Sequence, residues 1–336
     1  MVRMVSGFCE AVGETPLIKI NSLSKWTGCE ILGKAEMMNP GGSVKDRAAL
    51  GIVLRGEKEG LLQPQGIIID GSAGNTGIGL AHVAKARGYR CIIVIPETQS
   101  PEKFQHLEAL GAEVRKVKAA PYKDPANYNH IAKRLAEEIP GGFWANQFDN
   151  TANRDQHFRT TGPEIFRDTG GKIDGFVSVV GTGGTLAGVS MYLKSQNPSV
   201  KTACADPHGA AMWSWFTRGN LDFNEGSSVT EGIGQNRVTK NIEGAPVDMA
   251  FRVADQPIIE MVYFLRDYEG LCLGTSGALN LIGACLLAKR LGPGHTIVTI
   301  LCDSGIKYAS RLFNPQWLAE KKLTPRLQGL DFLTDL

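Results

Sequence analysis

A single lysine, Lys45, stands at the start of an apolar helical pattern, directly after a turn that contains Pro40 and two glycines. The pattern from Val44 to Val53 puts apolar side chains on one helix face, so the lysine should lie beside a crevice. An amine held away from water loses its proton more readily than a solvated one and can condense with an aldehyde. Lys45 is therefore a candidate for covalent catalysis, although the ordinary place of a lone helical lysine is the solvated surface.

A glycine-rich loop, Gly181–Thr185, follows a β-branched run that ends at Val180 and opens a predicted helix. Free N–H groups and the positive end of the helix dipole bind anions at such a place, and glycine lets the main chain approach them. The dinucleotide fingerprint GxGxxG fails because Leu186 replaces its third glycine, and no GxxxxGK[ST] sequence occurs. The loop therefore favours a monophosphate. A dinucleotide site using Asp206 after the next strand, and a purely structural turn, are the open alternatives.

A second loop of the same kind, Gly71–Gly79, follows the β-branched run Gly66–Asp70. Here Ser72, Asn75 and Thr76 add side-chain donors to the free N–H groups, a set suited to a carboxylate. Two anion-binding loops in one chain suggest a substrate carboxylate and a cofactor phosphate. The alternative is that Ser72 and Asn75 only cap the helix.

The elements around these loops alternate between short β-branched runs and longer amphipathic stretches. This alternation is typical of βαβ units and a parallel sheet, and so of an α/β fold. The predicted strands span residues 66–70, 91–95, 113–117, 176–180, 201–205, 251–253 and 296–302. The predicted helices span residues 44–59, 75–87, 101–110, 127–138, 154–168, 184–196, 256–268, 276–291 and 305–313.

The length of 336 residues predicts two domains. No linker rich in proline, glycine or serine separates them, and no repeat of about 20 to 50 residues is present. We therefore expect two domains that interleave, with the seam between Asn146 and Arg159.

Composition excludes several classes of function. Lysine and arginine number 36 against 34 acidic residues, without a block of like charge, so nucleic-acid binding is not expected. No apolar run reaches the roughly 18 residues of a membrane span, and residues 1–12 lack the apolar core of a secretory signal. Seven cysteines without a CxxC pair indicate reduced thiols in a cytosol-like compartment. The six histidines show no metal-ligand spacing, so we expect no catalytic metal.

Five segments occur in the order in which a known family carries them. They are Asn39–Arg47 (NPGGSVKDR), Ser72–Gly77 (SAGNTG), Gly181–Thr185 (GTGGT), Glu231–Gly234 (EGIG) and Gly274–Gly277 (GTSG). The set resembles the pyridoxal-phosphate-dependent cysteine synthases (O-acetylserine sulfhydrylases) and cystathionine β-synthases, and the resemblance extends from Gly13 to Gly305. It implies fold type II, two interleaved three-layer αβα domains with mostly parallel sheets. Residues 46–155 would form a smaller, mobile domain for the substrate carboxylate, and residues 1–45 and 156–336 a larger cofactor-binding domain.

The resemblance also implies roles for single residues. Lys45 would hold pyridoxal 5′-phosphate as an internal aldimine and remove the Cα proton of the substrate. Gly181, Thr182, Gly183, Gly184 and Thr185 would bind the cofactor phosphate, Asn75 the pyridoxal 3′-oxygen, and Ser276 the pyridine nitrogen. The substrate would meet Ser72, Ala73, Gly74, Asn75, Thr76, Gln147 and Gly232.

A hydroxyl at Ser276 would leave the pyridine nitrogen unprotonated, which favours expulsion of a β-substituent over transamination. Helix capping by Ser276 is an alternative that is compatible with this role. The implied reaction is β-replacement through an α-aminoacrylate, converting O-acetyl-L-serine or a related activated serine and sulfide into L-cysteine.

Other functions stay open at this stage. Within the family they are condensation of the cystathionine β-synthase type and desulfhydration of cysteine, a β-elimination that releases sulfide. Outside it they are a catalytically weak binding partner and, by fold alone, a nicotinamide dehydrogenase. The expected partners are a small amino acid and sulfide or a thiol, without nucleic acid or membrane. A homodimer in the cytoplasm, or in an organellar matrix, is expected.

Two departures from the family pattern bear on the substrate. Position 73 is Ala73, where most members carry a hydroxyl residue that contacts substrate. The segment Asn153–His157 also differs from the usual one and would bring Arg154 near the site, unless Arg154 is a surface residue. The pair Lys45–Asp46 is closer to the cystathionine β-synthases.

Overall fold

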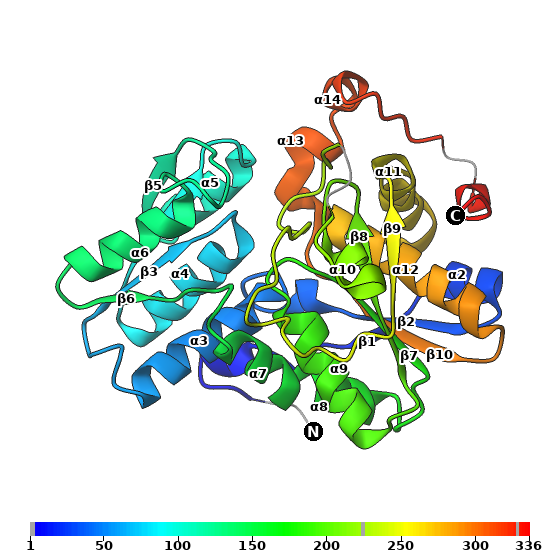
Figure 1. Ribbon diagram of the computed structural model, residues 1–336, viewed down its shortest axis with the longest axis horizontal. Helices are drawn as coiled ribbons and strands as arrows, with labels where there is room; N and C mark the ends of the chain where they lie inside the picture. Colours follow the sequence, from blue (N-terminus) through cyan, green and yellow to red (C-terminus); the bar gives the residue numbers. More distant parts are fainter. Residues whose placement is uncertain (1–3, 223–225, 327–328) are drawn as a thin grey trace.

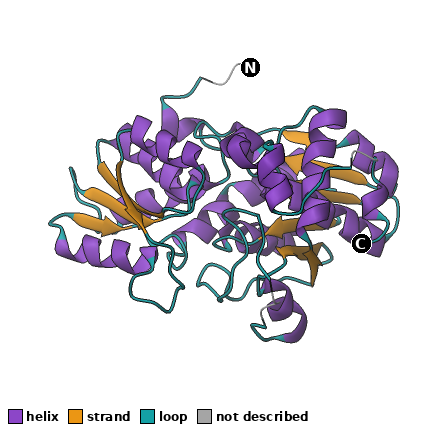
Figure 2. Ribbon diagram, turned by 90° about the horizontal axis from the view of Figure 1, so that it is seen from above, coloured by secondary structure: helices purple, strands orange, loops and turns teal. Residues whose placement is uncertain are grey.

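The structure, a computed structural model, describes residues 4–222, 226–326 and 329–336. The strands among these residues form one sheet of four and one of six. Figure 1 shows the two sheets side by side, and Figure 2 shows helices on both faces of each. The predicted α/β fold of type II, with mostly parallel sheets, is confirmed.

The four-stranded sheet is parallel throughout and has the order β5-β4-β3-β6. Its strands are β3 (Ile67–Gly71), β4 (Arg90–Pro96), β5 (Glu113–Val117) and β6 (Gly142–Trp144). β3 is buried along its whole length, as expected for a parallel strand covered by helices on both faces. All four strands lie inside residues 46–155.

The six-stranded sheet has the order β1-β2-β10-β7-β8-β9, in which only the pair β1–β2 is antiparallel. Its strands are β1 (Leu17–Lys19), β2 (Glu30–Lys34), β7 (Gly175–Val179), β8 (Lys201–Pro207), β9 (Met249–Val253) and β10 (Thr296–Ile300). Strands that precede residues 46–155 and strands that follow them therefore meet in one sheet.

The described α-helices are α1 (Phe8–Ala11), α2 (Asn21–Thr27), α3 (Lys45–Lys58), α4 (Asn75–Arg87), α5 (Pro101–Ala109), α6 (Tyr128–Glu138), α7 (Ala152–Arg159), α8 (Thr161–Asp168), α9 (Gly184–Gln196), α10 (Met212–Arg218), α11 (Asp255–Phe264), α12 (Thr275–Leu291), α13 (Ala309–Leu312) and α14 (Pro315–Glu320). Shorter 3₁₀ or π turns are η1 (Glu36–Met38), η2 (Leu265–Glu269), η3 (Gly305–Tyr308) and η4 (Asp331–Leu333). None of the helices in the described ranges has the length and apolar character needed to cross a membrane.

Some predicted elements were wrong. The helix predicted for residues 154–168 is two helices, α7 and α8, because Thr160 leaves the helical conformation (φ −126°, ψ −66°). The helix predicted for residues 305–313 is the 3₁₀ turn η3 followed by α13. The strands β1, β2 and β6 were not predicted, because three to five residues show too little alternation to be recognised.

A buried ionic network anchors the start of α3 to the six-stranded sheet. Arg47 contacts Glu36 (Nε to Oε2, 2.7 Å) and Glu164 (Nη1 to Oε1, 2.6 Å), and Lys34 Nζ lies 2.9 Å from Oε2 of Glu164. Burial alone would raise the pKa of Glu164, but its bonds with Arg47 and Lys34 lower it to about 2. The network holds the first turn of α3, and with it Lys45, in one position.

Candidate active site

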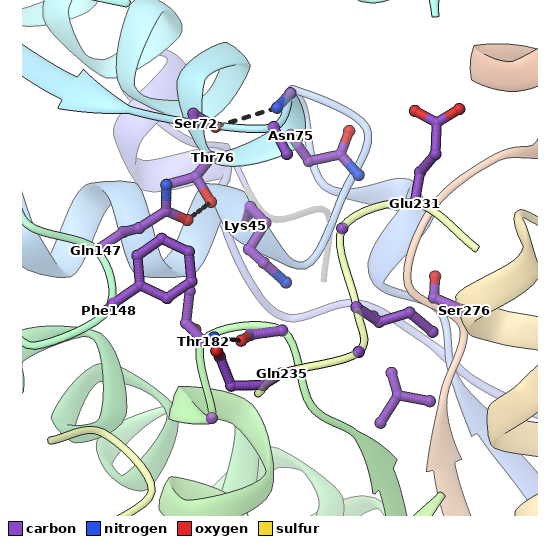
Figure 3. Close-up of a pocket in the computed structure, with 18 of the residues that line it drawn as sticks. Lys45, Ser72, Asn75, Thr76, Gln147, Phe148, Thr182, Glu231, Gln235 and Ser276 are labelled. Atoms are coloured by element: carbon purple, nitrogen blue, oxygen red, sulfur yellow. Dashed lines mark hydrogen bonds between the residues drawn. The ribbon is translucent and has the colours of Figure 1, made fainter. Parts of the chain in front are cut away.

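A cavity of about 560 Å³ lies where the carboxyl ends of β3 and β7 face each other. In parallel α/β folds such strand ends are the usual place for a ligand. Figure 3 shows Lys45 projecting into this space, with Ser72, Asn75 and Gln147 on one side and Thr182, Gln235 and Ser276 on the other.

The cavity brings together almost all the residues predicted from the sequence. The lining contains Lys45, Ser72, Ala73, Gly74, Asn75, Thr76, Gln147, Gly181, Thr182, Gly183, Thr185, Gly232 and Ser276. Gly184 is the exception, because it packs against Asn153: a Cβ atom there would lie 2.1 Å from Asn153 Oδ1. The individual roles of these residues stay predictions.

Lys45 is the first residue of α3 and is partly buried. Its amine has no hydrogen-bond or ion-pair partner anywhere in the described part of the chain. Lys45 is thus not a solvated surface charge but a free amine in the cavity, which is what covalent attachment of an aldehyde requires.

The loop Gly181–Thr185 joins β7 to α9 and is held on several sides. Thr182 Oγ1 accepts a bond from Asn153 Nδ2 (2.8 Å), and Thr239 Oγ1 donates to the Thr182 carbonyl (2.7 Å). Gln235 Nε2 donates to the Gly181 carbonyl (3.0 Å). The N-cap residue of α9, Gly183, makes no side-chain cap, and the N–H of Gly184 makes only a long bond to Thr182 Oγ1 (3.5 Å), so the N–H groups of this turn can turn to a ligand.

The packing of this loop explains its glycines. A Cβ atom at Gly181 would lie 2.4 Å from the Gly232 carbonyl oxygen, and Gly183 has a φ of +90° that other residues rarely adopt. Glycine is therefore required at Gly181 by the close packing against Gly232 and at Gly183 by the backbone conformation. Together with the hydroxyls of Thr182 and Thr185, these uncapped N–H groups fit the phosphate of the expected cofactor.

His157 lies behind the loop, fully buried, with Nε2 at 3.2 Å from Thr185 Oγ1 and Nδ1 at 2.9 Å from Thr161 Oγ1. Burial, and then the charges of Arg47 and Lys45, lower its pKa well below the usual range. The imidazole is therefore neutral at physiological pH, and it orients the Thr185 hydroxyl without adding positive charge.

The loop after β3 is organised by Ser72. The Ser72 Oγ atom accepts bonds from the N–H groups of Gly74 (3.1 Å) and Gly77 (2.9 Å). Both are acceptor contacts, so the hydroxyl proton is still available for a carboxylate in the cavity. The capping alternative is thus correct for Ser72 without excluding a role in binding.

Thr76 and Gln147 join this loop to the end of β3. Thr76 Oγ1 donates to Gln147 Oε1 (2.6 Å), and Gln147 Nε2 donates to Asp70 Oδ2 (2.9 Å) and to the Gly71 carbonyl (2.6 Å). Complete burial raises the pKa of Asp70 to about 7. The loop therefore rests on a carboxyl group that titrates close to neutral pH.

Asn75 and Ser276 meet at one carboxylate that was not predicted, Asp303. Asn75 Nδ2 donates to Asp303 Oδ2 (2.6 Å), and Ser276 Oγ lies 3.5 Å from Asp303 Oδ1. Asn75 thus does not cap α4. The capping alternative for Ser276 is also wrong, because α12 begins at Thr275 and no side chain caps it.

Two sequence-based suggestions do not reach the cavity. Arg154 is absent from the lining, since its guanidinium donates to the carbonyls of Lys240 (3.4 Å) and Glu243 (3.2 Å). Asp206, suggested for a dinucleotide site, instead accepts a bond from the N–H of Trp213 (2.8 Å) at the start of α10. The structure therefore gives no support to a dinucleotide site.

The lining also contains charged residues that were not predicted as site residues: Lys103, Lys123, Glu231 and Arg237. Glu231 opens the EGIG segment, so that motif could have identified it. Arg237 pairs with Asp149 (3.0 Å) and stacks at 4.3 Å over the ring of Tyr122. Lys103 lies in α5 without any motif around it.

In the described ranges, no group of three or more His, Cys, Asp or Glu residues is placed to hold a metal ion.

Comparisons with known proteins agree with this geometry. A family model described as "Pyridoxal-phosphate dependent enzyme" matches residues 9–303. Cysteine synthase 1 of Neurospora crassa is 52% identical over 95% of this chain and 86% of its own length, and Cysteine synthase 1 of Emericella nidulans is 51% identical over 95% and 87%. The crystal structure of an O-acetylserine dependent cystathionine beta-synthase from Helicobacter pylori is 32% identical, with a TM-score of 0.82, and covers 92% of this chain and 99% of that one. The chain therefore belongs to the pyridoxal-phosphate-dependent enzymes, in the group of the cysteine synthases and cystathionine β-synthases.

Proposed function

We propose that the protein makes L-cysteine and acetate from O-acetyl-L-serine and sulfide. The observation that carries this proposal is the unpaired Lys45 amine between two anion-binding loops of different construction. The identity of about half of all residues with two fungal cysteine synthases supports the choice of substrates.

The cofactor-side residues are Lys45, the loop Gly181–Thr185, Asn75 and Ser276. When bound, pyridoxal phosphate supplies an aldehyde for an amine and a sink for the electrons left at Cα after proton loss. The Lys45 amine would hold it covalently, and the N–H groups at the start of α9 with the Thr182 and Thr185 hydroxyls would hold its phosphate.

The substrate-side residues are the Ser72–Thr76 loop, with Gln147 and Gly232 beside it. The Ser72 hydroxyl proton and the loop N–H groups would bind the carboxylate of O-acetylserine. Lys45 Nζ would take the Cα proton and later return it. The Cβ–O bond breaks with its electron pair leaving on acetate, and hydrosulfide supplies the pair for the new Cβ–S bond.

A turnover assay tests the proposal. Purified protein with pyridoxal phosphate should convert O-acetylserine and sulfide into equal amounts of cysteine and acetate. Lys45→Ala should lower turnover by about a thousandfold or more, because it removes both the covalent attachment and the base. Lys58→Ala, at the exposed end of the same helix, is the matched control. No turnover by the wild-type protein would contradict the proposal.

A second candidate is condensation with homocysteine, favoured by the likeness to a solved O-acetylserine dependent cystathionine beta-synthase. Serine, O-acetylserine and cysteine, each assayed with sulfide and with homocysteine, separate the two reactions. Pyruvate and sulfide as the main products would instead indicate a desulfhydrase.

The domain assignment, with a mobile domain at residues 46–155, is part of this proposal. The four-stranded sheet lies within this range, and side-chain bonds such as Asn75–Asp303 cross to the rest of the chain. Bonds of this kind can break and re-form as a domain opens and closes. Small-angle X-ray scattering should detect compaction when an amino-acid ligand is added, and an unchanged profile would contradict mobility.

Assembly and location complete the proposal. The family resemblance supports a homodimer, which light scattering would detect as twice the mass of the chain. All seven cysteines are free, which supports the reducing cytoplasm, with an organellar matrix as the alternative. A fluorescent fusion in the source cells separates the two.

A further inference from the structure

The charged residues lining the cavity are unequal in sign. Four are cationic, namely Lys45, Lys103, Lys123 and Arg237, and among the described lining residues Glu231 is the single carboxylate. In Figure 3 Glu231 stands on the same side of the cavity as Asn75. Whether this one carboxylate is paired or free therefore decides whether the cavity offers a negative charge to an incoming molecule.

Two cationic side chains form ion pairs with the Glu231 carboxylate, one at each oxygen. Lys103 Nζ lies 2.5 Å from Oε2, and Arg311 Nη1 lies 2.6 Å from Oε1. The side chains of Lys103 and Glu231 are only 2% and 9% exposed. With charges of +1, +1 and −1, this group of three residues has a net charge of +1, in a place that water screens weakly.

Lys103 is held firmly in this arrangement. Its ammonium also donates to the Ala73 carbonyl (3.1 Å) and lies 4.9 Å over the ring of Tyr308. Its stem fills the space beside Gly74, where a Cβ atom would lie 2.4 Å from Lys103 Cδ. The ammonium therefore cannot swing away to free Glu231 without disturbing the loop assigned to the substrate carboxylate.

We propose that Lys103, by neutralising Glu231, selects an anionic thiolate as the second substrate against a thiol that carries an ammonium group. The inference rests on the proposed β-replacement and adds the charge class of its nucleophile. Hydrosulfide and carboxylated thiolates are attracted by the net positive lining, whereas an ammonium group finds no free carboxylate to pair with. The reacting bonds are unchanged: sulfur supplies the electron pair to Cβ, and acetate leaves with the other pair.

Three thiols of similar size and different charge test this selection. With O-acetylserine as the first substrate, kcat/KM is measured for mercaptoacetate, 2-mercaptoethanol and cysteamine. The wild-type enzyme should use mercaptoacetate best and cysteamine least. The ratio of the values for mercaptoacetate and cysteamine is the readout, because it does not depend on the fraction of folded enzyme.

Two substitutions should move this ratio in opposite directions. Lys103→Met keeps most of the stem and lowers the net charge of the three residues to zero, so the ratio should fall about tenfold. Glu231→Gln raises the net charge to +2, so the ratio should rise about tenfold. Arg87→Gln breaks an ion pair of similar length with Glu57 (2.6 Å) near the exposed end of α4 and should leave the ratio unchanged.

The inference is overturned if Lys103→Met leaves the ratio at the wild-type value, or if both substitutions shift it in the same direction. Failure of the proposed function gives a different result, since the wild-type enzyme would then form no cysteine from O-acetylserine and hydrosulfide.

Discussion

The two glycine-rich loops of the site start alike and are held differently. Each follows a parallel strand and leads into a helix of 13 residues, α4 or α9. The loop Gly181–Thr185 is packed so tightly that a Cβ at Gly181 would lie 2.4 Å from a carbonyl oxygen. The loop Ser72–Gly77 instead packs against side chains, such as that of Lys103 beside Gly74, and is held by polar bonds, some of which, such as Asn75–Asp303, reach the segment after β10.

This difference corresponds to the different demands on the two loops. A cofactor phosphate stays bound through many turnovers, so a rigid, close-packed loop serves it. A substrate carboxylate must bind and leave each time, and polar bonds that exchange with a ligand allow this. The comparison predicts that damage to the first loop affects cofactor affinity, while damage to the second affects substrate affinity.

The largest effect is expected from Gly181→Ala. The added methyl group would collide with the Gly232 carbonyl and displace the loop, so pyridoxal phosphate should bind about a hundredfold more weakly. Titration of the apoprotein with the cofactor, followed by visible absorbance, measures this. The exposed Ser195→Ala, near the end of the helix that follows the loop, is the control. Unaltered cofactor affinity in Gly181→Ala would contradict the assignment of the cofactor to the loop Gly181–Thr185.

A smaller effect is expected from Ser72→Ala. Two N–H groups lose their acceptor and the carboxylate loses a donor, so the KM for O-acetylserine should rise about tenfold. Cofactor affinity should stay the same, as in the exposed control Ser195→Ala. If Ser72→Ala lowered the affinity for the cofactor and left the KM for O-acetylserine unchanged, the Ser72–Gly77 loop would serve the cofactor, against the comparison.

The smallest effect on ligand binding is expected at Asp70, the carboxyl group beneath the Ser72–Gly77 loop, which acts on the stability of the fold. Burial raises its pKa from 3.8 to about 7, so in this range the folded protein keeps a proton that the unfolded chain has lost. The stabilising contribution is complete below pH 3.8 and disappears as the pH rises through about 7. Asp70→Asn, which stays neutral, should remove most of this loss, which the shift in pKa sets at about 4 kcal/mol.

Urea unfolding at a series of pH values measures the free energy of unfolding for this prediction, with the exposed Asp335→Asn as control. His157, behind the other loop, has a lowered pKa and contributes the opposite slope below its usual pKa of 6.5. An identical pH dependence in Asp70→Asn and the wild type would show that Asp70 is ionised in the folded protein.

The sequence predicted α4 and α9 to the residue, because a strand, a glycine turn and a helix start leave a local pattern. It also identified Lys45 and both loops, whose motifs are continuous in the chain. It could not identify Lys103 or Asp303, because their partners Glu231 and Asn75 are 128 and 228 residues away. Such pairings depend on the tertiary arrangement of the two sheets, which no local pattern contains.

The central claim is that Lys45 carries the cofactor between the two loops. Borohydride reduction of the holoenzyme followed by peptide mass spectrometry tests it most directly, because the phosphopyridoxyl group becomes fixed to the lysine that holds it. The strongest rival is Lys307, which donates to Asn75 Oδ1 (3.3 Å) and whose pKa burial lowers. We predict the label on the peptide containing Lys45 alone. A label on Lys103, Lys123 or Lys307, or no labelled peptide at all, would contradict the account.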